Sequence, residues 1–368
     1  MRSEPQKLAV MLDPRGIIGK GGLSVISRHN KYSEMLGSRT HGEKTLIVLT
    51  LVPRGTPASQ LPATIVSFTS RITWILGSVR FLLNNRSRIY LFVTGNPWES
   101  FWVTWLLKNL SCIRARLQVQ FHGDFCDVKW KSMSWKNKLR FKSLPLVVGL
   151  CDDVRFVGKV QYLNTTKMFP SLRDRSVLAP IPFHLGEFQV QPFDPHDHFT
   201  IGIVGRIHKD KGIDNTLRFI HCLSLSEYSF SVIFVGEGPE RPRVTSTLDA
   251  LEVDFHITGH VMGDELEIAW HSIDVVLSMA PVESFGLVLR EALARGKRVV
   301  ATLNGGVIEL QSELPAKHGL EILSEDWDCD SVRGAIELLK SHKPRPEIRD
   351  FLARQANDSL ERLIESWI

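Results

Sequence analysis

Cysteine is scarce in this chain of 368 residues, and its pattern excludes the usual cysteine-based scaffolds. The five cysteines are odd in number, scattered, and never spaced as Cys-x-x-Cys: Cys112, Cys126, Cys151, Cys222 and Cys329. This argues against a disulfide framework and a structural zinc site, and it is typical of a reducing cytosol. We expect the five thiols to be small buried hydrophobic groups.

Long apolar runs are also missing. The best candidate, residues 90–110, is interrupted by Asn96-Pro97, Glu99 and Lys108, so no run reaches the ~18 apolar residues of a membrane span. The opening sequence MRSEPQKLAVML has no long apolar segment of the kind found in a signal peptide. We therefore expect a cytoplasmic protein with neither a spanning helix nor a leader.

Acidic residues are sparse in the first half of the chain. Residues 1–190 contain 27 lysines and arginines against 11 aspartates and glutamates, whereas residues 191–368 contain 18 against 29. The modest net charge of +5 hides this asymmetry. It indicates that the N-terminal half faces an anionic partner, for which a membrane surface and nucleic acid are the usual candidates. The alternative is an uneven distribution of solvating charges with no partner.

The remaining composition, 43% hydrophobic and 23% charged, is that of a globular protein long enough for two domains. Short apolar runs alternate with longer segments of helical period, which is typical of parallel α/β sheets. A proline-rich stretch over residues 179–196 is the predicted interdomain linker, and the amphipathic tail from Pro346 is a predicted helix. The predicted strands are residues 8–12, 45–51, 89–94, 117–121 and 146–150 in the first half, and 200–204, 231–235, 253–258, 274–278 and 298–302 in the second.

The most informative segment reads VESFGLVLREALARGKRVVAT. Its turn follows a predicted strand and precedes a helical pattern, so it should lie at the carboxyl edge of a sheet, where α/β proteins bind ligands. The first N–H groups of that helix favour an anion. Glu283 and Glu291 would lie about 12 Å apart. That spacing suits an extended ligand with a diphosphate between its two ends, such as a nucleotide sugar.

Three further turns follow predicted strands of the same half. The first, GRIHKDKG, combines Gly205 with the cations Arg206 and Lys211, which suits a diphosphate. The others are VGEGP around Gly236 and TGHV ending at Val261, and a glycine-rich NGGVIE follows the last predicted strand. Each is a weak signal alone, because solvated βα loops often contain glycine and lysine, but together they indicate one binding rim.

This ordered set of motifs resembles the donor half of glycosyltransferase family 4. The resemblance implies the GT-B architecture, α/β with two Rossmann-like, doubly wound parallel-sheet domains that face each other across a cleft. It also implies transfer of a sugar from a nucleoside diphosphate sugar with retention at the anomeric carbon. We accordingly divide the chain into residues 1–183, facing acceptor and membrane, residues 184–345, binding the donor, and a helix over residues 346–368 that crosses back to the first domain.

The resemblance also suggests roles for individual residues. Arg206 and Lys211 would bind the diphosphate and stabilise the leaving group, and Glu283 would contact the donor sugar. Glu291 would reach the ribose hydroxyls. Backbone contacts would come from a short turn: Phe285, Gly286 and Leu287. Without a ligand, Glu283 would be a helix-capping carboxylate and Glu291 an ordinary surface residue.

In the first half, the glycine-rich loop IGKGGLS opens a helix after the first predicted strand. Gly21 and Gly22 occupy the place of the family's N-terminal glycine loop and would contact the donor. His122, at the end of another predicted strand, matches the family's histidine near the reacting sugar, although a lone histidine there is often structural. The proline-asparagine-glycine motif common at the family's domain junction is absent.

A basic, aromatic segment follows His122. On one helical wheel, Trp130, Met133, Phe141 and Leu144 form an apolar stripe flanked by bases, which is typical of a helix in an anionic membrane interface. The proposed membrane residues are Lys129, Trp130, Lys131, Lys136, Lys138, Arg140, Phe141 and Lys142. Trp135 and Leu139 lie on the other side of this wheel, where they would pack on the domain unless the segment is an ordinary surface helix. Single-stranded nucleic acid would fit such a segment too, but the donor motifs make it a poor second.

We therefore predict a retaining glycosyltransferase that uses a UDP- or GDP-linked sugar without a metal or other cofactor. It would act on a lipid-linked or surface-glycan acceptor, as in polysaccharide biosynthesis, from the cytoplasmic face of a membrane, without binding nucleic acid. The Asp328-Cys329-Asp330 triplet lies far from the donor motifs and is predicted to cap a helix. The alternatives are a nucleotide-sugar epimerase or hydrolase of similar fold, and a non-catalytic nucleotide-sugar-binding protein.

Overall fold

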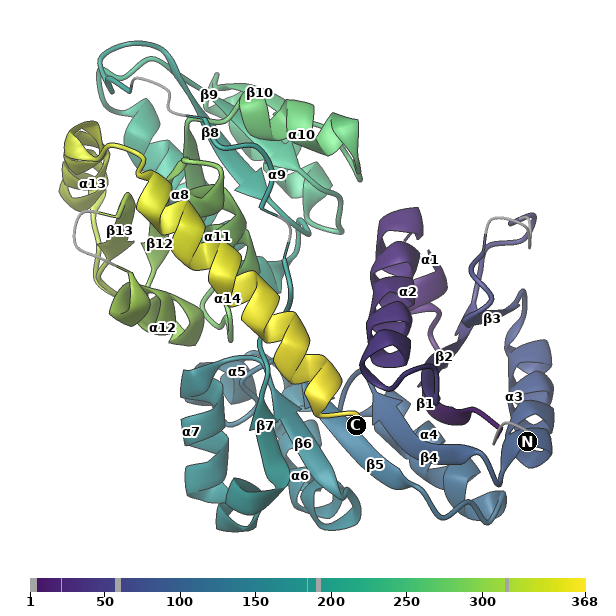
Figure 1. Ribbon diagram of the computed structural model, residues 1–368. Helices are drawn as coiled ribbons and strands as arrows, with labels where there is room; N and C mark the ends of the chain where they lie inside the picture. The colour runs from purple at the N-terminus through teal and green to yellow at the C-terminus, as the bar shows by residue number, and fades with distance from the viewer. Residues whose placement is uncertain (1–4, 21, 57–60, 184, 190–192, 315–317) are drawn as a thin grey trace. The chain divides into compact units, whose positions relative to one another are not determined.

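The computed structural model describes residues 5–20, 22–56, 61–183, 185–189, 193–314 and 318–368 (Figure 1). The chain divides into two compact units, each described here by itself. The first unit comprises Met1–Cys126, Ser134–Pro180 and Ser359–Ile368, and the second comprises Asp127–Met133 and Ile181–Asp358. The division therefore falls inside the proline-rich stretch, just after Pro180, and a short piece of the basic segment is grouped with the second unit.

The first unit is built on a parallel sheet of seven strands in the order β3-β2-β1-β4-β5-β6-β7. Its central strands are buried on both faces, as expected for a sheet covered by helices. The strands are β1 (Lys7–Asp13), β2 (Lys44–Leu51), β3 (Ile65–Phe68), β4 (Ile89–Thr94), β5 (Arg116–Phe121), β6 (Asp153–Phe156) and β7 (Ser176–Leu178).

The helices of this unit cover both faces of the sheet. They are α1 (Ile17–Lys20), α2 (Gly22–Arg39), α3 (Arg71–Asn85), α4 (Glu99–Leu110), α6 (Trp135–Leu150), α7 (Lys159–Met168) and the 3₁₀ helix η2 (Pro170–Arg175). The chain moves from β1 toward one edge through α2, and from β3 back toward the other edge through α3, α4 and α6. Because parallel crossovers are right-handed, α3, α4 and α6 lie on the face away from α2.

The second unit has a six-stranded parallel sheet in the order β10-β9-β8-β11-β12-β13. Its strands are β8 (Phe199–Val204), β9 (Phe230–Val235), β10 (Asp254–Ile257), β11 (Val275–Ser278), β12 (Arg298–Thr302) and β13 (Leu320–Leu323). Its helices are α5 (Val128–Ser132), η3 (Lys209–Lys211), α8 (Ile213–Ser224), α9 (Arg241–Ala250), α10 (Asp264–His271), α11 (Leu287–Ala294), α12 (Gly305–Glu313) and α13 (Cys329–Ser341).

The tail forms the long helix α14 (Pro346–Glu365), the yellow helix in Figure 1. Ile348 and Leu352 are buried in a core cluster of the second unit, whereas Leu363 and Trp367 are buried in the core of the first. The amphipathic helix predicted from Pro346 is thus present, and its two ends belong to different units.

Nine of the predicted strands form, but the tenth was wrong. Residues 146–150 were predicted as a strand, yet they end helix α6. Leu144, Val147 and Val148 are buried while Leu146 and Leu150 are exposed. That spacing is helical, so the apolar run LPLVVGL was too short to reveal its period. Short strands β3, β6, β7 and β13 were missed.

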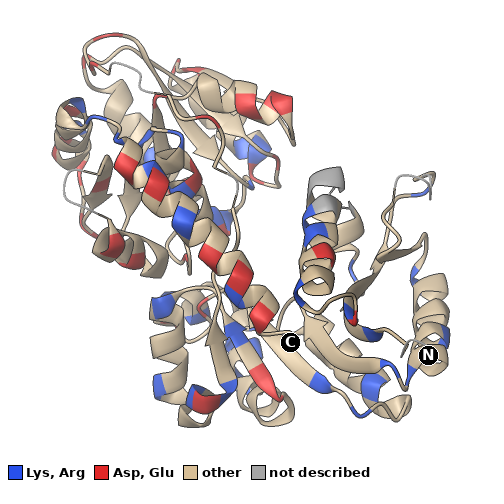
Figure 2. Ribbon diagram, in the orientation of Figure 1, with Lys and Arg blue, Asp and Glu red and all other residues tan. Residues whose placement is uncertain are grey.

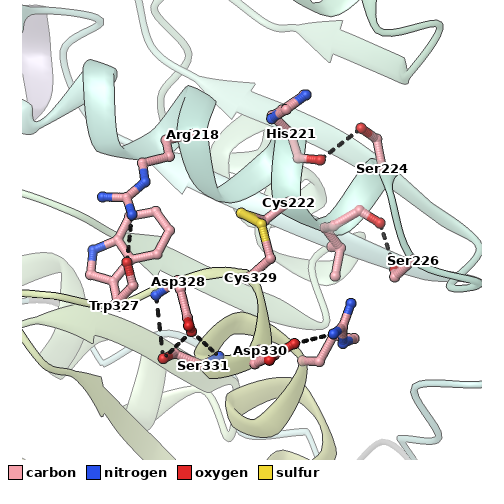
Figure 3. The surroundings of a disulfide bond; sticks show 12 residues. Arg218, His221, Cys222, Ser224, Ser226, Trp327, Asp328, Cys329, Asp330 and Ser331 are labelled. Carbon is pink, nitrogen blue, oxygen red and sulfur yellow. Dashed lines mark hydrogen bonds and ion pairs between the residues drawn. A yellow bond between two sulfur atoms is a disulfide. The ribbon is translucent and has the colours of Figure 1, made fainter.

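The expectation that all five cysteines are small buried thiols was also wrong. Cys222 near the end of α8 is bonded to Cys329 at the start of α13 (Figure 3). Cys126 and Cys151 are buried as expected, but Cys112 is exposed. The argument from cysteine usage for a reducing compartment therefore fails, and the cytoplasmic location stays a prediction. In the part of the chain that is described, no helix combines the length and apolarity needed to cross a membrane.

Candidate functional site

The turns that follow β8 and β9 pack backbone against backbone at the carboxyl edge of the second sheet. The Gly205 N–H donates to the Val235 carbonyl at 2.9 Å, and the Ile207 N–H donates to the Glu237 carbonyl at 3.0 Å. Gly205 and Gly236 are thus in neighbouring turns, as the sequence predicted. The TGHV turn lies beside them, with Val261, which ends this turn of the predicted binding rim, half-buried against the unit's core.

The basic turn after β8 is fixed against the end of β11. Gly212 has a φ of 75°, and a Cβ built there would lie 1.9 Å from the Met279 carbonyl oxygen. Only glycine tolerates both the left-handed conformation and this approach. The turn therefore holds Lys211 next to the segment that contains Glu283.

Lys211 and Glu283 form the central ion pair of the site. The Lys211 Nζ lies 2.8 Å from Glu283 Oε2, and both side chains are partly buried. The sequence placed both residues at a donor site without predicting that they pair. The carboxylate of Glu283 thus neutralises the charge of Lys211 in this arrangement.

The turn after Glu283 leads directly into α11 and packs on the glycine pair that opens α12. The Gly306 N–H donates to the Glu283 carbonyl at 2.7 Å. A Cβ at Gly306 would lie 2.7 Å from the Gly286 nitrogen, so a larger residue would push the two turns apart. Helix α11 has no side-chain cap to satisfy its first N–H groups, whereas α12 is capped by Asn304, whose side chain accepts from the Val307 N–H at 3.0 Å.

Arg290 packs against this turn and holds it in place. The sequence analysis did not predict this role. Its guanidinium is fully buried, lies 3.9 Å from the centre of the Phe285 ring and donates to the Phe285 carbonyl. It also pairs with Glu313 at 3.1 Å and donates to Gln355 of α14 at 2.8 Å. Burial lowers its pKa, with Glu313 acting in the other direction. Arg290 thus fixes the position of the predicted donor-contacting turn.

Phe285 itself is buried, so only its backbone is available to a ligand, whereas Leu287 at the start of α11 is half-buried. Ser284 is also buried, and its hydroxyl has no hydrogen-bond partner among the described residues. Glu291, one helical turn beyond Leu287, is half-buried. The predicted contacts of these residues with a donor stay predictions.

Arg206 is the exposed member of the basic pair. It forms an ion pair with Asp210 at 2.8 Å, and the same carboxylate contacts His208 Nδ1 at 2.7 Å. The sequence analysis overlooked Asp210. Because exposed pairs contribute only about 0–1 kcal/mol, Arg206 can exchange Asp210 for a ligand phosphate at little cost.

A pocket of about 120 Å³ lies next to the Glu283 turn, lined by Lys129, Asn215, Pro281, Thr302, Leu303, Ser324, Glu325 and Trp327. Small-ligand sites usually measure roughly 300–1,000 Å³, so this pocket holds at most a part of a nucleotide sugar. Lys129 pairs with Glu325 at its wall. Beside it, Arg218 stacks over Trp327 at 4.1 Å and donates to its carbonyl, next to the disulfide (Figure 3).

In the first unit, the predicted glycine loop is largely helical. Gly21 lies outside the described residues, Ile17–Lys20 forms α1, and Gly22 is the first residue of α2. The prediction of an open loop over these residues was wrong because Asp13 caps α1. Its carboxylate accepts from the Ile17 and Ile18 N–H groups at 3.0 and 2.7 Å.

His122 follows β5 and joins a hydrogen-bonded chain. Its Nε2 lies 3.1 Å from Gln120 Oε1, which also accepts from Arg155 Nη1 at 3.0 Å. Because that oxygen is an acceptor, Nε2 carries the proton and Nδ1 is free to accept. Desolvation by surrounding protein atoms, followed by the charges of Arg155 and Arg28, lowers the pKa of His122, although the residue is exposed by its surface area. The ring is neutral at pH 7.

The basic segment after His122 does not form the predicted single helix. Asp127 caps α5, and Ser134 caps α6 by accepting from the Asn137 N–H at 3.1 Å. The predicted apolar stripe is therefore broken at Ser134, and Leu144 is buried in the first unit. The bases that this segment exposes on α6 are Lys136, Lys138 and Lys142, whereas Arg140 is half-buried, 5.9 Å from the centre of the Trp98 ring.

Asp328 is the N-cap of α13 and accepts from the Ser331 N–H at 2.9 Å, which confirms its predicted capping role. Among the described residues, no group of three His, Cys, Asp or Glu side chains is arranged to hold a metal ion. The absence of a metal requirement stays a prediction.

Comparison with known proteins identifies the second unit. Residues 198–341 match the family described as glycosyl transferases group 1. The match covers less than half of the chain, and it is this region that is similar to that family. The resemblance to glycosyltransferase family 4 is thereby confirmed, and the matched region contains the turns around Gly205, Gly236, Val261, Glu283 and Gly306.

Two curated relatives cover parts of the chain. One subunit of the phosphatidylinositol N-acetylglucosaminyltransferase of Homo sapiens is 26% identical over 210 residues, which are 55% of this chain and 42% of the relative. A GDP-mannose-dependent alpha-mannosyltransferase of Corynebacterium glutamicum is 31% identical over 137 residues, 36% of this chain and 30% of the relative. The chain thus spans less than half the length of these relatives.

Among solved structures, Anabaena HepE in complex with UDP and glucose superposes with a TM-score of 0.67 at 14% identity, covering 98% of this chain and 99% of that one. At this identity the likeness shows the fold alone. Together with the two parallel sheets, it confirms the predicted α/β GT-B fold.

Proposed function

We propose that the protein is a retaining glycosyltransferase that moves a sugar from a nucleoside diphosphate sugar to a lipid-linked or surface-glycan acceptor at the cytoplasmic face of a membrane. The observation that carries the proposal is the Lys211–Glu283 pair beside the α11 and α12 N-termini, inside a region of group 1 glycosyl transferase sequence. A cation, the uncapped N-terminus of α11 and a carboxylate at one sheet edge suit a diphosphate joined to a sugar.

In the proposed reaction, the bond between the anomeric carbon and the diphosphate oxygen breaks. The acceptor hydroxyl oxygen bonds to the same face of that carbon, and its proton passes to the departing phosphate oxygen. Lys211 and Arg206 stabilise the negative charge that develops on the diphosphate. Such preorganised electrostatic stabilisation is often the largest single contribution to catalysis.

Glu283 has two successive partners in this proposal. Before a donor binds, Glu283 pairs with Lys211. When the diphosphate replaces Glu283 as the partner of Lys211, the carboxylate accepts hydrogen bonds from sugar hydroxyls. Glu291 contacts the ribose, and the backbone of the 285–287 turn contacts sugar and phosphate. His122, neutral at pH 7 with an accepting Nδ1, is suited to a substrate hydroxyl.

The donor base is either uracil or guanine, because HepE binds UDP and the Corynebacterium relative is named for GDP-mannose. The lipid acceptor is supported by the phosphatidylinositol in the name of the human relative and by the exposed bases and apolar residues of α6. A surface-glycan acceptor would use the same donor chemistry.

One experiment separates this function from its rivals. The purified protein is incubated with radiolabelled UDP- and GDP-sugars, with and without a membrane lipid extract. Label that enters lipid or glycan only when the extract is present supports transfer. Turnover without any acceptor would instead identify an epimerase or hydrolase, and binding without turnover would identify a non-catalytic protein.

A further inference from the structure

Helix α3 of the first unit exposes an aliphatic stripe that packs on no other described element. Trp74, Ser78 and Leu82 face the sheet and are buried. The outward face carries four large exposed residues: Ile72, Ile75, Leu76 and Leu83. Ile72 is 72% exposed and Leu76 is 66% exposed. At helical spacing these residues form one continuous stripe.

Helix α6 shows the same pattern. Trp135 and Leu139, which the sequence analysis had assigned to the inner side, are 71% and 61% exposed. Leu146 and Leu150 continue their stripe. This is the reverse of the predicted orientation, because the buried side of α6 is Leu144, Val147 and Val148.

The charges beside both stripes have one sign. Neither α3 nor α6 contains an Asp or Glu. Arg71 and Arg80 flank the stripe of α3, whereas Lys138 flanks that of α6 and Lys142 lies within it. Figure 2 shows α3 in blue and tan, without red. No helix of the second unit exposes more than one large apolar residue within the described part of the chain.

Both helices belong to one layer. The right-handed crossovers place α3, α4 and α6 on the same face of the first sheet. Helix α4, between them in the chain, adds exposed Leu106 and Leu110. The stripes therefore form one broad face, which we call the α3–α6 face. Contiguous exposed apolar surface of this kind marks an interaction site.

The charge of the face decides between a bilayer and a second copy of the chain. The three helices contain one acidic residue, Glu99 of α4, which pairs with Arg15, so two such faces packed together would place arginines and lysines largely against like charges. An anionic bilayer supplies both the apolar interior for the stripes and phosphates for the flanking bases.

We propose that the α3–α6 face is a membrane-docking surface, in which α3 inserts its aliphatic stripe beside α6 into the interface of an anionic bilayer. This rests on the membrane part of the proposed function and deepens it by adding a helix that the basic segment does not contain. Its test needs no transfer activity.

The test measures binding of the full chain to sedimented vesicles of phosphatidylcholine with 30 mol% phosphatidylglycerol. The α3 variant is Ile72→Ser with Leu76→Ser. Its matched control is Leu225→Ser with Ile268→Ser, two exposed residues of the second unit, both 66% exposed. We expect the affinity of the α3 variant for the vesicles to fall by about tenfold or more, because the variant loses two inserted side chains. The control should bind like the unchanged protein.

Two further readouts keep the result interpretable. Thermal unfolding and UDP or GDP binding must be unchanged in the α3 variant, which shows that it folds. Vesicles should shift the Trp fluorescence to shorter wavelength, and the shift should shrink in Trp135→Phe. Vesicles of phosphatidylcholine alone should bind much more weakly.

The proposal is overturned if the α3 variant binds vesicles as well as the control does. It is also overturned if the unchanged protein does not bind anionic vesicles and sedimentation shows that it forms a dimer, which the α3 variant does not form. In that case a second copy of the chain covers the face. Failure of the proposed function would look different: vesicle binding would persist while nucleotide sugars were neither bound nor turned over.

Discussion

The two units share a sheet plan but differ in where their informative residues lie. In the second unit they gather in the turns at the carboxyl edge of the sheet, held by backbone contacts and one buried arginine. In the first unit they lie on the outer faces of helices, as apolar stripes with basic borders. Turn residues at a sheet edge recognise a small ligand, whereas helix faces offer area to an extended one. The proposed donor site and the proposed docking surface thus use different parts of the same sheet plan.

The largest expected effect tests the support beneath the donor turn. Arg290→Ala removes a buried cation and leaves Glu313 and the Phe285 carbonyl without it, so the free energy of unfolding should fall by about 3–5 kcal/mol. Denaturant titration measures this. Arg333→Ala, which breaks an exposed pair with Asp330, should change it by under about 1 kcal/mol. Equal losses of unfolding free energy in the two variants would mean that the burial of Arg290 does not contribute to stability.

The catalytic role of the second unit is tested at Lys211. Lys211→Ala should lower the rate of sugar transfer by about 10²–10³, the usual effect of removing one preorganised charge-stabilising group. The neighbouring exposed Lys209 provides the control, since Lys209→Ala leaves the ion pair with Glu283 in place. A transfer rate that is equally reduced in both variants would point to general loss of positive charge.

The disulfide ties α8 to α13 across 107 residues of the second unit. Cys222→Ser should reduce the free energy of unfolding by about 2–4 kcal/mol, and a reducing agent should have the same effect on the unchanged protein. Cys112→Ser, at an exposed free thiol, serves as the control. If reductant does not lower the stability of the unchanged protein, the bond contributes nothing in solution.

The smallest effect concerns the first unit and pH. Burial lowers the pKa of His29 to about 4, with the neighbouring Arg28 acting in the same direction, and Val25 and Asp13 opposing it. The unfolded chain therefore binds more protons between pH 6.5 and 4, so stability is complete above pH 6.5 and falls as pH decreases. His29→Gln should remove on the order of 2 kcal/mol of this loss. An unchanged slope of unfolding free energy against pH would exclude the histidine as its source.

The same contrast explains what the sequence could predict. The turns around Gly205, Gly236 and Glu283 were recognisable because glycine, charge and strand end coincide within a few residues. Alternating apolar runs likewise located nine strands. Such signals are local, so a single sequence carries them.

What was missed depends on contacts between distant residues. The role of Arg290 follows from its contacts with Glu313 and Gln355, which are distant in the sequence. Likewise, the disulfide of Cys222 follows only from its position next to Cys329. Trp135 and Leu139 were correctly separated from Leu144 on the helical wheel, but the side that faces the core was misjudged. The unrecognised Ser134 cap also separates Trp130 and Met133 from the stripe. A helix with apolar residues on two faces gives no periodic signal that tells the core from the partner surface.

The most direct test of the account is hydrogen–deuterium exchange of the full chain with and without UDP or GDP. We predict that one nucleotide slows exchange in the turns 205–212 and 283–291 and at the start of α12, while the α3–α6 face exchanges as before. Protection confined to the first unit, or none with either nucleotide, would contradict the assignment of the second unit's turns as the donor site.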